Sequence, residues 1–354
     1  MPVPLPGHPA VRGAGPGWLV IVEKEPALRD LLDAMAVGRI PAGGRWEEWQ
    51  VRPVTGGANN RLYHVQTPGG DLAIKFTLRD RRARAAREYA AQRALQEVGL
   101  AVAPRPILLD LTRFPLPIVV QEWLPGPVSA QLPAGDEGWE ALLDHFSAIH
   151  SVTPGKTTVP LRKAVINFAS AGQGVRTVQR MASRLPPSAR PGDLWDLVQR
   201  LGAARFPRWQ PPALALCRTD PAPLNFIRRP GGWASVDWEN SGWGDPAFEI
   251  ADLLAHPAYL DVPPERQEWL ISTYCQRSGD PGAELRIRND YKIMQVFWVV
   301  RLARYLYEVP RGQDERLVDR PDGWEADIRA KYGRYVEEAS AGLADRQTGQ
   351  NRVP

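Results

Sequence analysis

Residues 217–226 read C-R-T-D-P-A-P-L-N-F, and this stretch decides how the rest of the chain is interpreted. Apolar residues flank it on both sides, yet Pro221 and Pro223 interrupt it. Proline fixes the backbone and removes an amide donor, so the pattern predicts a rigid loop and excludes both a regular helix and a central strand. Such a loop would hold Asp220 and Asn225 in fixed positions.

The residues that follow this loop predict a β-hairpin. Two short strand-like runs, 225–228 and 233–237, flank a Pro-Gly-Gly turn at 230–232. Asn225 and Asp237 are equally far from the centre of that turn, so a regular hairpin would place them opposite each other, with Cβ atoms roughly 4.5–5.5 Å apart. An amide oxygen beside a carboxylate suits Mg²⁺, which prefers hard oxygen ligands.

Asp220 precedes Asn225 by five residues and would lie near the same end of the hairpin. A carboxylate next to a metal that carries phosphates can accept a hydroxyl proton or orient the hydroxyl. Taken singly, Asn225 and Asp237 are more simply explained as turn caps. The three residues together, at this spacing, favour metal-assisted phosphoryl transfer.

An antiparallel sheet with one helix is predicted over residues 44–123. The expected strands are 62–67, 71–77, 106–111 and 116–123, with a helix over 80–98. Gly56-Gly57 precede the first strand, where glycines allow backbone amides to approach phosphates, although such a pair often only forms a turn. Lys75 lies in the apolar strand D-L-A-I-K-F-T and needs an anion: Glu88 or a phosphate. A purely structural Lys75 is the alternative.

Helical periodicity dominates residues 124–343, after a hinge at Leu124-Pro125-Gly126. The expected helices are 139–149, 164–185, 194–204, 264–275 and 290–309. Residues 1–43 are interpreted as a flexible leader and N-terminal extension, and 344–354 as a disordered tail. The fold class is therefore α+β, with a sheet-containing N-terminal lobe and a mostly helical C-terminal lobe that carries one short hairpin at the active site.

Composition bounds the remaining function classes. The net charge of +4 and the pI of about 9.1 raise nucleic acid as a partner, but the basic stretch 79–87 is most simply a solvated helix face. No apolar run is long enough for a membrane span. Two cysteines, Cys217 and Cys275, are too few for a disulfide framework and fit a reducing cytoplasm. We expect a cytoplasmic monomer or homodimer that binds neither nucleic acid nor membrane.

The order of these motifs resembles the aminoglycoside phosphotransferase and choline kinase group, which shares the protein-kinase-like fold. The similarity covers roughly residues 45–310 and is carried by a Gly loop, a strand lysine, a helix glutamate, V-V-Q-E-W-L-P-G at 119–126, F-S-A-I-H at 146–150, D-x-x-x-x-N at 220–225 and S-V-D-W-E followed by G-D-P-A-F-E-I-A-D-L. No single motif is decisive, but their order and spacing together are specific.

The resemblance implies a role for each matching residue. Those implied to bind ATP are Gly56, Gly57, Asn60, Lys75, Glu88 and the backbone of Glu122–Leu124. Asp220 is implied to be the catalytic carboxylate, and Asn225 and Asp237 to hold Mg²⁺. Asp245 and Asp252 are expected to brace loops without touching substrate.

One position departs from the family pattern. Arg218 stands two residues before Asp220, where the family usually has histidine. Arginine can still donate hydrogen bonds, but it is longer and permanently charged, so we expect it to pair with Asp220 or Asp237 and to weaken a carboxylate as a base. The resemblance implies an ATP-dependent phosphotransferase, and the departure leaves a weakly active or inactive nucleotide-binding pseudokinase as the alternative.

The phosphate acceptor stays open at this point. The candidates are an aminoglycoside-like antibiotic, a sugar, a macrolide, or a neutral or anionic metabolite alcohol. Acidic residues gather at 237–268, which favours a cationic acceptor, but several of them would serve the metal or the fold, and the protein as a whole is basic.

Overall fold

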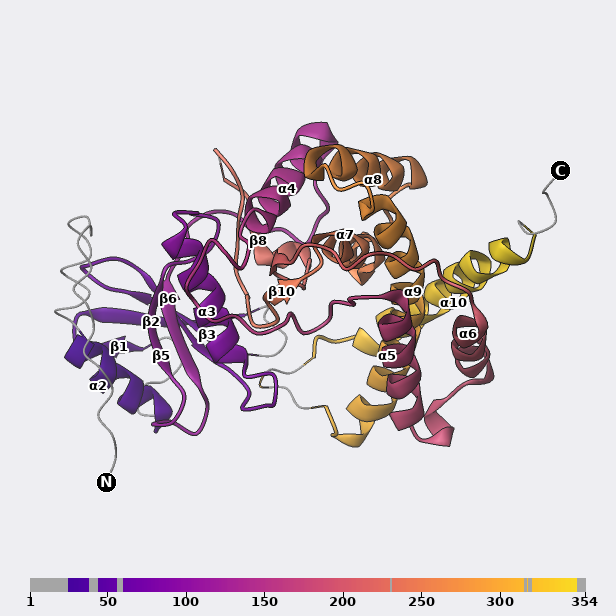
Figure 1. Ribbon diagram of the computed structural model, residues 1–354. Coiled ribbons are helices and arrows are strands. Elements are labelled where there is room, and N and C mark those ends of the chain that lie inside the picture. The colour runs from indigo at the N-terminus through magenta and orange to yellow at the C-terminus, as the bar shows by residue number, and fades with distance from the viewer. Residues whose placement is uncertain are drawn as a thin grey trace, which may run out of the picture.

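The computed structural model describes residues 25–37, 44–55, 60–229, 231–314, 317 and 320–348. Gly56 and Gly57, and most of the expected leader, lie outside the described residues. Figure 1 shows two lobes, one built around a sheet and the other mostly from helices. The predicted α+β, bilobal kinase-like architecture is confirmed.

Six antiparallel strands form the N-terminal sheet, in the order β1-β2-β3-β4-β6-β5. They are β1 Arg45–Trp46, β2 Trp49–Val54, β3 Arg61–Gln66, β4 Leu72–Phe76, β5 Pro106–Asp110 and β6 Ile118–Glu122. The four predicted strands correspond to β3–β6. The sequence analysis missed β2, in which Pro53 discourages a strand; β1 pairs only with the start of β2, so Pro53 lies where the sheet edge is open.

Side-chain alternation along β4 separates the two faces of this sheet. Leu72, Ile74 and Phe76 join a hydrophobic cluster that also contains residues of helix α2 (Glu25–Ala36). This helix lies inside residues 1–43, which were expected to be a flexible leader and N-terminal extension. Ala73 and Lys75 point to the opposite face, where helix α3 (Arg84–Glu97) packs. The period of two therefore directs the one lysine of this strand toward α3 and the interlobe cleft.

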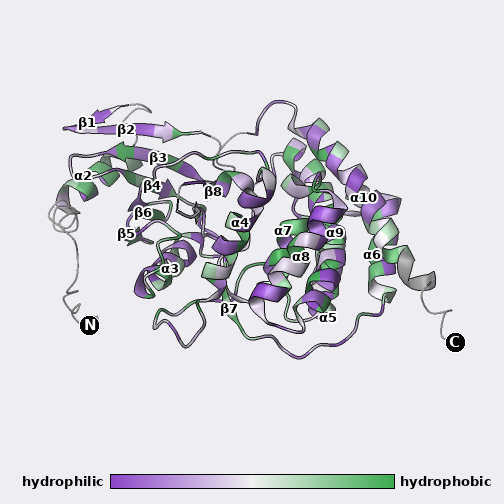
Figure 2. Cartoon of the chain, turned by 90° about the horizontal axis from the view of Figure 1, so that it is seen from above, coloured by the Kyte–Doolittle hydropathy of each residue, from purple (hydrophilic) through white to green (hydrophobic). Residues whose placement is uncertain are grey.

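The C-terminal lobe is organised around α9, against which α5, α7 and α10 pack. Its helices are α4 Gly135–His150, α5 Ala171–Arg184, α6 Gly192–Ala203, α7 Pro246–Ala255, α8 Pro264–Ser278, α9 Ala283–Glu308 and α10 Trp324–Thr348. Its short strands are β7 Ala215–Cys217, β8 Phe226–Ile227, β9 Ala234–Ser235 and β10 Gly242–Gly244. In Figure 2 hydrophobic residues colour much of α7 and α9 green, in keeping with their buried positions.

Several helices differ from expectation, among them α9, which begins at Ala283, seven residues before its expected start. Helix α5 begins seven residues late, because the amides of Ala164 and Val165 bond to carbonyls at 240–243 and Ser170 caps the helix. Helix α7 was not predicted. Helix α10 was also missed, and it continues to Thr348, five residues into the segment expected to be disordered. None of the described helices is long and apolar enough to cross a membrane.

Candidate active site

The loop that carries Asp220 is held by a buried glutamate on α7. Strand β7 pairs with β10 and delivers the chain to Arg218 and Thr219, whose amides each donate to Glu249 Oε1 at 2.7 Å. Thr219 adopts a left-handed backbone conformation with φ of 49°, which a β-branched residue rarely takes. The two amide hydrogen bonds to Glu249 stabilise this unfavourable conformation and thereby fix the position of the Asp220 backbone. The sequence analysis gave Glu249 no role.

The predicted pairing of Asn225 with Asp237 is wrong by one residue. Strands β8 and β9 pair so that Asn225 lies opposite Val236, whose amide donates to the Asn225 carbonyl at 2.9 Å. The six-residue connection 228–233 is centred between two residues and not on Gly231. Asp237 follows with φ of 64°, a left-handed conformation that aspartate tolerates. Asn225 and Asp237 nevertheless line the same cavity of about 260 Å³ in the interlobe cleft.

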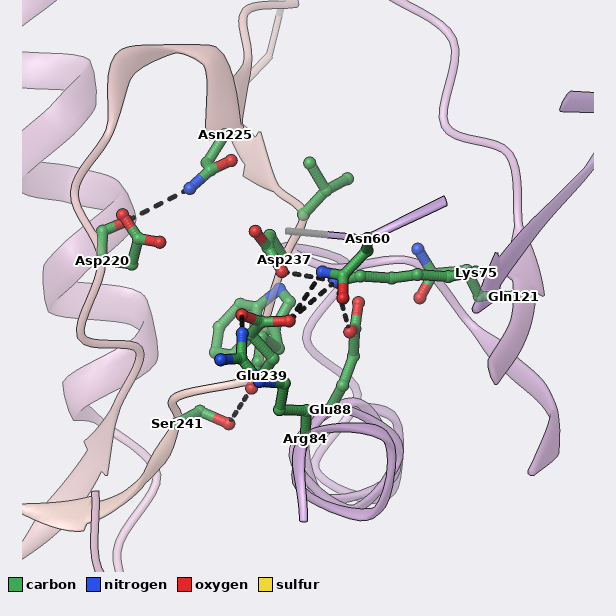
Figure 3. Close-up of polar contacts among 12 residues, drawn as sticks. Asn60, Lys75, Arg84, Glu88, Gln121, Asp220, Asn225, Asp237, Glu239 and Ser241 are labelled. Atoms are coloured by element: carbon green, nitrogen blue, oxygen red, sulfur yellow. Dashed lines mark hydrogen bonds and ion pairs between the residues drawn. The ribbon is translucent and has the colours of Figure 1, made fainter. Parts of the chain in front are cut away.

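Lys75 is surrounded by carboxylates from both lobes. Its Nζ lies 2.7 Å from Glu88 Oε2, forms an ion pair with Asp237 and lies 3.8 Å from Glu239 Oε2. Figure 3 shows the lysine reaching from β4 between Glu88 of α3 and the segment that contains Asp237 and Glu239. The expected contact with Glu88 is present, and the contacts with the hairpin segment tie the two lobes together.

Glu239 is a member of this cluster that the sequence analysis did not assign. Its side chain is buried, accepts a 2.7 Å hydrogen bond from Asn60 Nδ2 and forms an ion pair with Arg84. The expectation of a solvated arginine face is therefore wrong for Arg84, which is buried because it neutralises Glu239. The signal was available in V-D-W-E, where a second carboxylate stands two residues after Asp237.

Burial and neighbouring charges set the protonation of the cluster. Burial raises the pKa of Glu88 to about 7, although the Lys75 ammonium opposes this shift. Burial also acts to raise the pKa of Asp237, but the charge and hydrogen bond of Lys75 outweigh it, and the net pKa is lowered. Lys75 itself has a raised pKa, because three carboxylates outweigh its burial. Asp237 therefore stays ionised and Lys75 stays charged.

Arg218 bonds to backbone carbonyls and not to the carboxylates that we expected. Its guanidinium is buried, donates to the carbonyl of Asp220 and to that of Val236 at 2.8 Å, and lies over the ring of Phe226 with its Cζ 5.2 Å from the ring centroid. Burial raises the pKa of Asp220, and the Arg218 charge only partly opposes that effect. Asp220 is thus a stronger base than an ordinary aspartate, opposite to our expectation. Arg218 joins the Asp220 loop to the hairpin.

At the other end of the 260 Å³ cavity, the chain leaves β6 through Glu122, Trp123 and Leu124, which line it. The amides of Glu122 and Trp123 donate to the carbonyls of Arg105 and Asp71, each at 2.9 Å. The amide of Leu124 has no partner within the part of the chain that the structure describes. It is the free main-chain donor among the three residues predicted to receive adenine.

The two remaining predicted aspartates differ in their surroundings. Asp245 caps α7 by accepting from the Ala247 amide at 2.9 Å and pairs with Arg286 Nε at 2.7 Å, so it braces the fold as expected. Asp252 instead lines a second cavity, of about 110 Å³, together with Asp220. Its position in the wall of an open cavity differs from the loop-bracing position that we expected.

The sheet-containing lobe, the helical lobe and the cleft between them define a protein-kinase-like fold. More specifically, the chain belongs to the phosphotransferase enzyme family, whose model matches residues 50–287. A shorter similarity links it to Protein LicA of Haemophilus influenzae, with 33% identity over 63 residues. That alignment covers 18% of this chain and 22% of the length of LicA.

Solved structures share the fold at low identity. A putative aminoglycoside phosphotransferase from Ralstonia eutropha JMP134 superposes with a TM-score of 0.61 at 16% identity, covering 89% of this chain and 97% of that one. Choline kinase from Cryptosporidium parvum Iowa II gives 0.58 at 13% identity over 90% and 97%. A spectinomycin phosphotransferase in complex with ADP and spectinomycin gives 0.55 at 13% identity over 83% and 93%.

Proposed function

We propose that this protein transfers the γ-phosphoryl group of ATP to a hydroxyl group of a small molecule, with Asp220 as the catalytic carboxylate. The observation that carries the proposal is the arrangement of one cleft. Lys75, Glu88 and Asp237 meet at its centre, and Asn225 and Asp237 line the same 260 Å³ cavity. Asp220 stands on the adjoining loop, at the wall of a second cavity.

The larger cavity is the proposed nucleotide site. Lys75 would bind the α- and β-phosphates, because its charge is fixed and Glu88 holds it from the far side. The Leu124 amide and the neighbouring carbonyls would receive the adenine. Asn60 lines this cavity and donates to Glu239, so it would act by fixing that carboxylate beside Lys75. Backbone amides of Gly56 and Gly57 remain the proposed cover for the phosphates.

Asn225 and Asp237 are the proposed holders of Mg²⁺, and their donor chemistry fits. Asp237 is ionised and its side chain is 26% exposed to the cleft. Asn225 uses its amide nitrogen for a long contact of 3.5 Å to the Asp220 carbonyl, which leaves the amide oxygen for a ligand. These are the hard oxygen donors that Mg²⁺ prefers. When bound, the ion would neutralise negative charge on the β- and γ-phosphates.

Asp220 would position and deprotonate the acceptor. The acceptor oxygen forms a bond to the γ-phosphorus, the bond from that phosphorus to the bridging β-phosphate oxygen breaks with its electron pair, and ADP leaves. The hydroxyl proton passes to Asp220, whose raised pKa suits it to accept a proton. Arg218 and Glu249 hold this carboxylate through the backbone and touch neither reactant.

A phosphotransfer assay with and without the Asp220 carboxylate tests the proposal. Production of ADP and of phosphorylated product is followed over a panel of neutral, anionic and cationic hydroxyl compounds. Asp220→Ala should lower turnover by about 10²–10⁴-fold and leave ATP binding nearly intact. Asp144→Ala, an exposed aspartate on α4 whose side chain is 73% exposed, serves as the matched control and should keep full activity.

Two results would contradict the proposal. Unchanged turnover in Asp220→Ala would remove Asp220 from its role. Tight binding of ATP with no transfer to any compound of the panel would favour a nucleotide-binding pseudokinase.

A further inference from the structure

Two neighbouring cavities that share lining residues form the acceptor side of the cleft. The inference drawn from them rests on the proposed function and concerns the charge of the acceptor. The 110 Å³ cavity contains Asp220, and a neighbouring cavity of about 330 Å³ lies between α9 and the segment before α3. Four residues line both cavities: Arg82, Ile166, Phe297 and Arg301. An acceptor whose hydroxyl reaches Asp220 would therefore pass between two arginines, one from each lobe.

Arg301, on α9, has aromatic partners but no close counter-ion. Its Nε donates to Tyr305 Oη at 2.8 Å, and its Cζ lies 5.3 Å from the ring centroid of Trp298 and 5.5 Å from that of Tyr305. Within the described part of the chain, no carboxylate lies within 4.0 Å of it and neither Nη atom has a hydrogen-bond partner. A guanidinium fixed along its stem, with its two terminal nitrogens free, can bind a carboxylate or a phosphate with two parallel hydrogen bonds.

Arg82 faces the same space with only a distant carboxylate. Its Nε lies 3.9 Å from Asp80 Oδ2, and that oxygen already accepts a 2.9 Å hydrogen bond from Arg84. Asp80 therefore neutralises Arg84 in preference to Arg82. Burial and the Arg84 charge lower the pKa of Arg82, and the Arg301 charge adds to this, so the two guanidiniums that line the cavities lie near enough to repel each other.

The other charged side chains of the 330 Å³ cavity form ion pairs. Glu308 accepts from Arg304 at 2.8 Å, and Asp314 accepts from Arg320 at 2.7 Å. Together with the pair of Asp80 and Arg84, these contacts account for every carboxylate that lines this cavity among the described residues. None of them compensates Arg301.

The smaller cavity offers little additional negative charge. Burial is the main cause that raises the pKa of Asp252 to about 8, so this aspartate is mostly uncharged at pH 7. Burial likewise lowers the pKa of His256 to about 3, so its imidazole is neutral. Asp220 is then the carboxylate that stands against two guanidinium groups.

We propose that the acceptor of this kinase is an anionic hydroxyl compound, whose carboxylate or phosphate binds between Arg82 and Arg301 while its hydroxyl reaches Asp220. Like-charge repulsion disfavours cationic acceptors at this site, and a neutral hydroxyl compound would leave the two guanidiniums without an anion. The transfer step is the one given above, so the anionic group binds and orients the acceptor and takes no part in bond formation.

Thermal stabilisation by matched small molecules tests this site directly. The probes share a three-carbon skeleton: glycerol, glycerate and glycerol 3-phosphate, with choline as the cation. Each is added at the same concentration and ionic strength to protein saturated with Mg²⁺ and AMP-PNP, which occupies the nucleotide phosphate site. We expect glycerate or glycerol 3-phosphate to raise the Tm, and glycerol and choline to leave it unchanged. The anion that raises the Tm more shows whether the site prefers a carboxylate or a phosphate.

Three variants locate the effect. Arg301→Gln should raise the dissociation constant of the preferred anion at least tenfold, because charge-assisted hydrogen bonds are lost. Arg82→Gln, at a side chain that is 40% exposed, should also weaken it and provides the same test if Arg301→Gln fails to fold. Arg288→Gln is the control, because Arg288 lies on the same helix, pairs with Glu268 and Glu284, and lines neither cavity.

The outcomes separate this inference from the proposed function. Equal stabilisation by anions and by glycerol, stabilisation by choline, or an anion effect that persists in both Arg301→Gln and Arg82→Gln would overturn the anionic acceptor. Transfer of phosphate to choline or kanamycin without anion binding would do so as well, while leaving the kinase activity in place. Anion binding that depends on Arg301, with no transfer to any compound, would support the anion site and contradict the proposed function alone.

Discussion

The nucleotide side and the acceptor side of the cleft differ in whether their cation forms ion pairs with carboxylates of the protein. On the nucleotide side, Lys75 is in ionic contact with Glu88, Asp237 and Glu239, with distances of 2.7 Å to the first and 3.8 Å to the last. On the acceptor side, Arg301 has a phenol oxygen at 2.8 Å and two aromatic rings, and no close carboxylate among the described residues. Lys75 is buried, and Arg301 is half-buried.

This difference distinguishes a cation whose counter-ions come from the protein from a cation that can take its counter-ion from a ligand. A buried cation without a counter-ion is unfavourable, and the structure relieves that cost for Lys75 with its own carboxylates. Arg301 has no ion pair of this kind among the described residues, and Asp220 and Asp252 act on its charge only from beyond 4.0 Å. A charged site that is already arranged before binding can stabilise its ligand without reorganisation. The comparison predicts that removing a cation has opposite consequences for stability on the two sides.

The largest effect is expected for Lys75→Met. The substitution leaves Glu88, Asp237 and Glu239 close together without their common cation, and removal of one partner from a buried ion pair costs about 3–5 kcal/mol. We expect the free energy of unfolding, measured by urea denaturation, to fall by that amount and ATP binding to be lost.

Lys331→Met is the matched control. Lys331 pairs with Asp327 at 2.8 Å on the solvent-exposed side of α10, where such pairs are worth at most about 1 kcal/mol. A Lys75→Met protein as stable as this control would show that the cluster does not depend on its lysine.

Much of the nucleotide side could be predicted from the sequence because it depends on local periodicity. Alternation along the strand places Lys75 on the face opposite Ile74, and a helix directly after the hairpin must cover that face, which brings Glu88 to the lysine. The predicted hairpin register is wrong because six residues, 228–233, connect β8 to β9, and an even number has no central residue at Gly231. The left-handed conformation of Asp237 after β9, with φ of 64°, was not indicated by any residue pattern either.

The acceptor side could not be predicted because its residues come from distant segments. Arg82 lies before α3 and Arg301 on α9, and only the packing of the two lobes brings them to one cavity. Likewise, the position of Asp252 depends on α7, which was missed since an almost wholly buried helix shows no amphipathic period. The pairing of Arg84 with Glu239 also crosses the two lobes.

An intermediate effect, dependent on pH, is expected for Asp252→Asn. The pKa of Asp252 is raised to about 8 in the folded protein, mainly by burial, whereas an unfolded aspartate has its ordinary value near 3.8. Between those values the unfolded chain is ionised while the folded protein keeps the proton, so the free energy of unfolding falls as pH rises. The slope contributed by this group is at most about 1.4 kcal/mol per pH unit.

Asparagine does not titrate, so Asp252→Asn should gain stability relative to the wild type from pH 5 to pH 8 and hold a constant difference above that. Urea denaturation at pH 5, 6, 7, 8 and 9 measures the two curves. Parallel curves over the whole range would mean that Asp252 titrates alike in both states, and the acceptor cavity would then carry one more negative charge than we infer.

The smallest effect is expected for Arg82→Gln, and its sign distinguishes the two sides of the cleft. Arg82 lies near the charges of Arg84 and Arg301, while its nearest carboxylate is at 3.9 Å and serves Arg84. Removing its charge therefore relieves repulsion, and since the side chain is 40% exposed, solvent screening limits the gain in unfolding free energy to about 0.5 kcal/mol. The gain should shrink as salt is raised from 50 mM to 500 mM, because screening already weakens the repulsion. Loss of stability at low salt would instead show that Arg82 has a compensating partner, and the contrast between the two sides of the cleft would then rest on Arg301 alone.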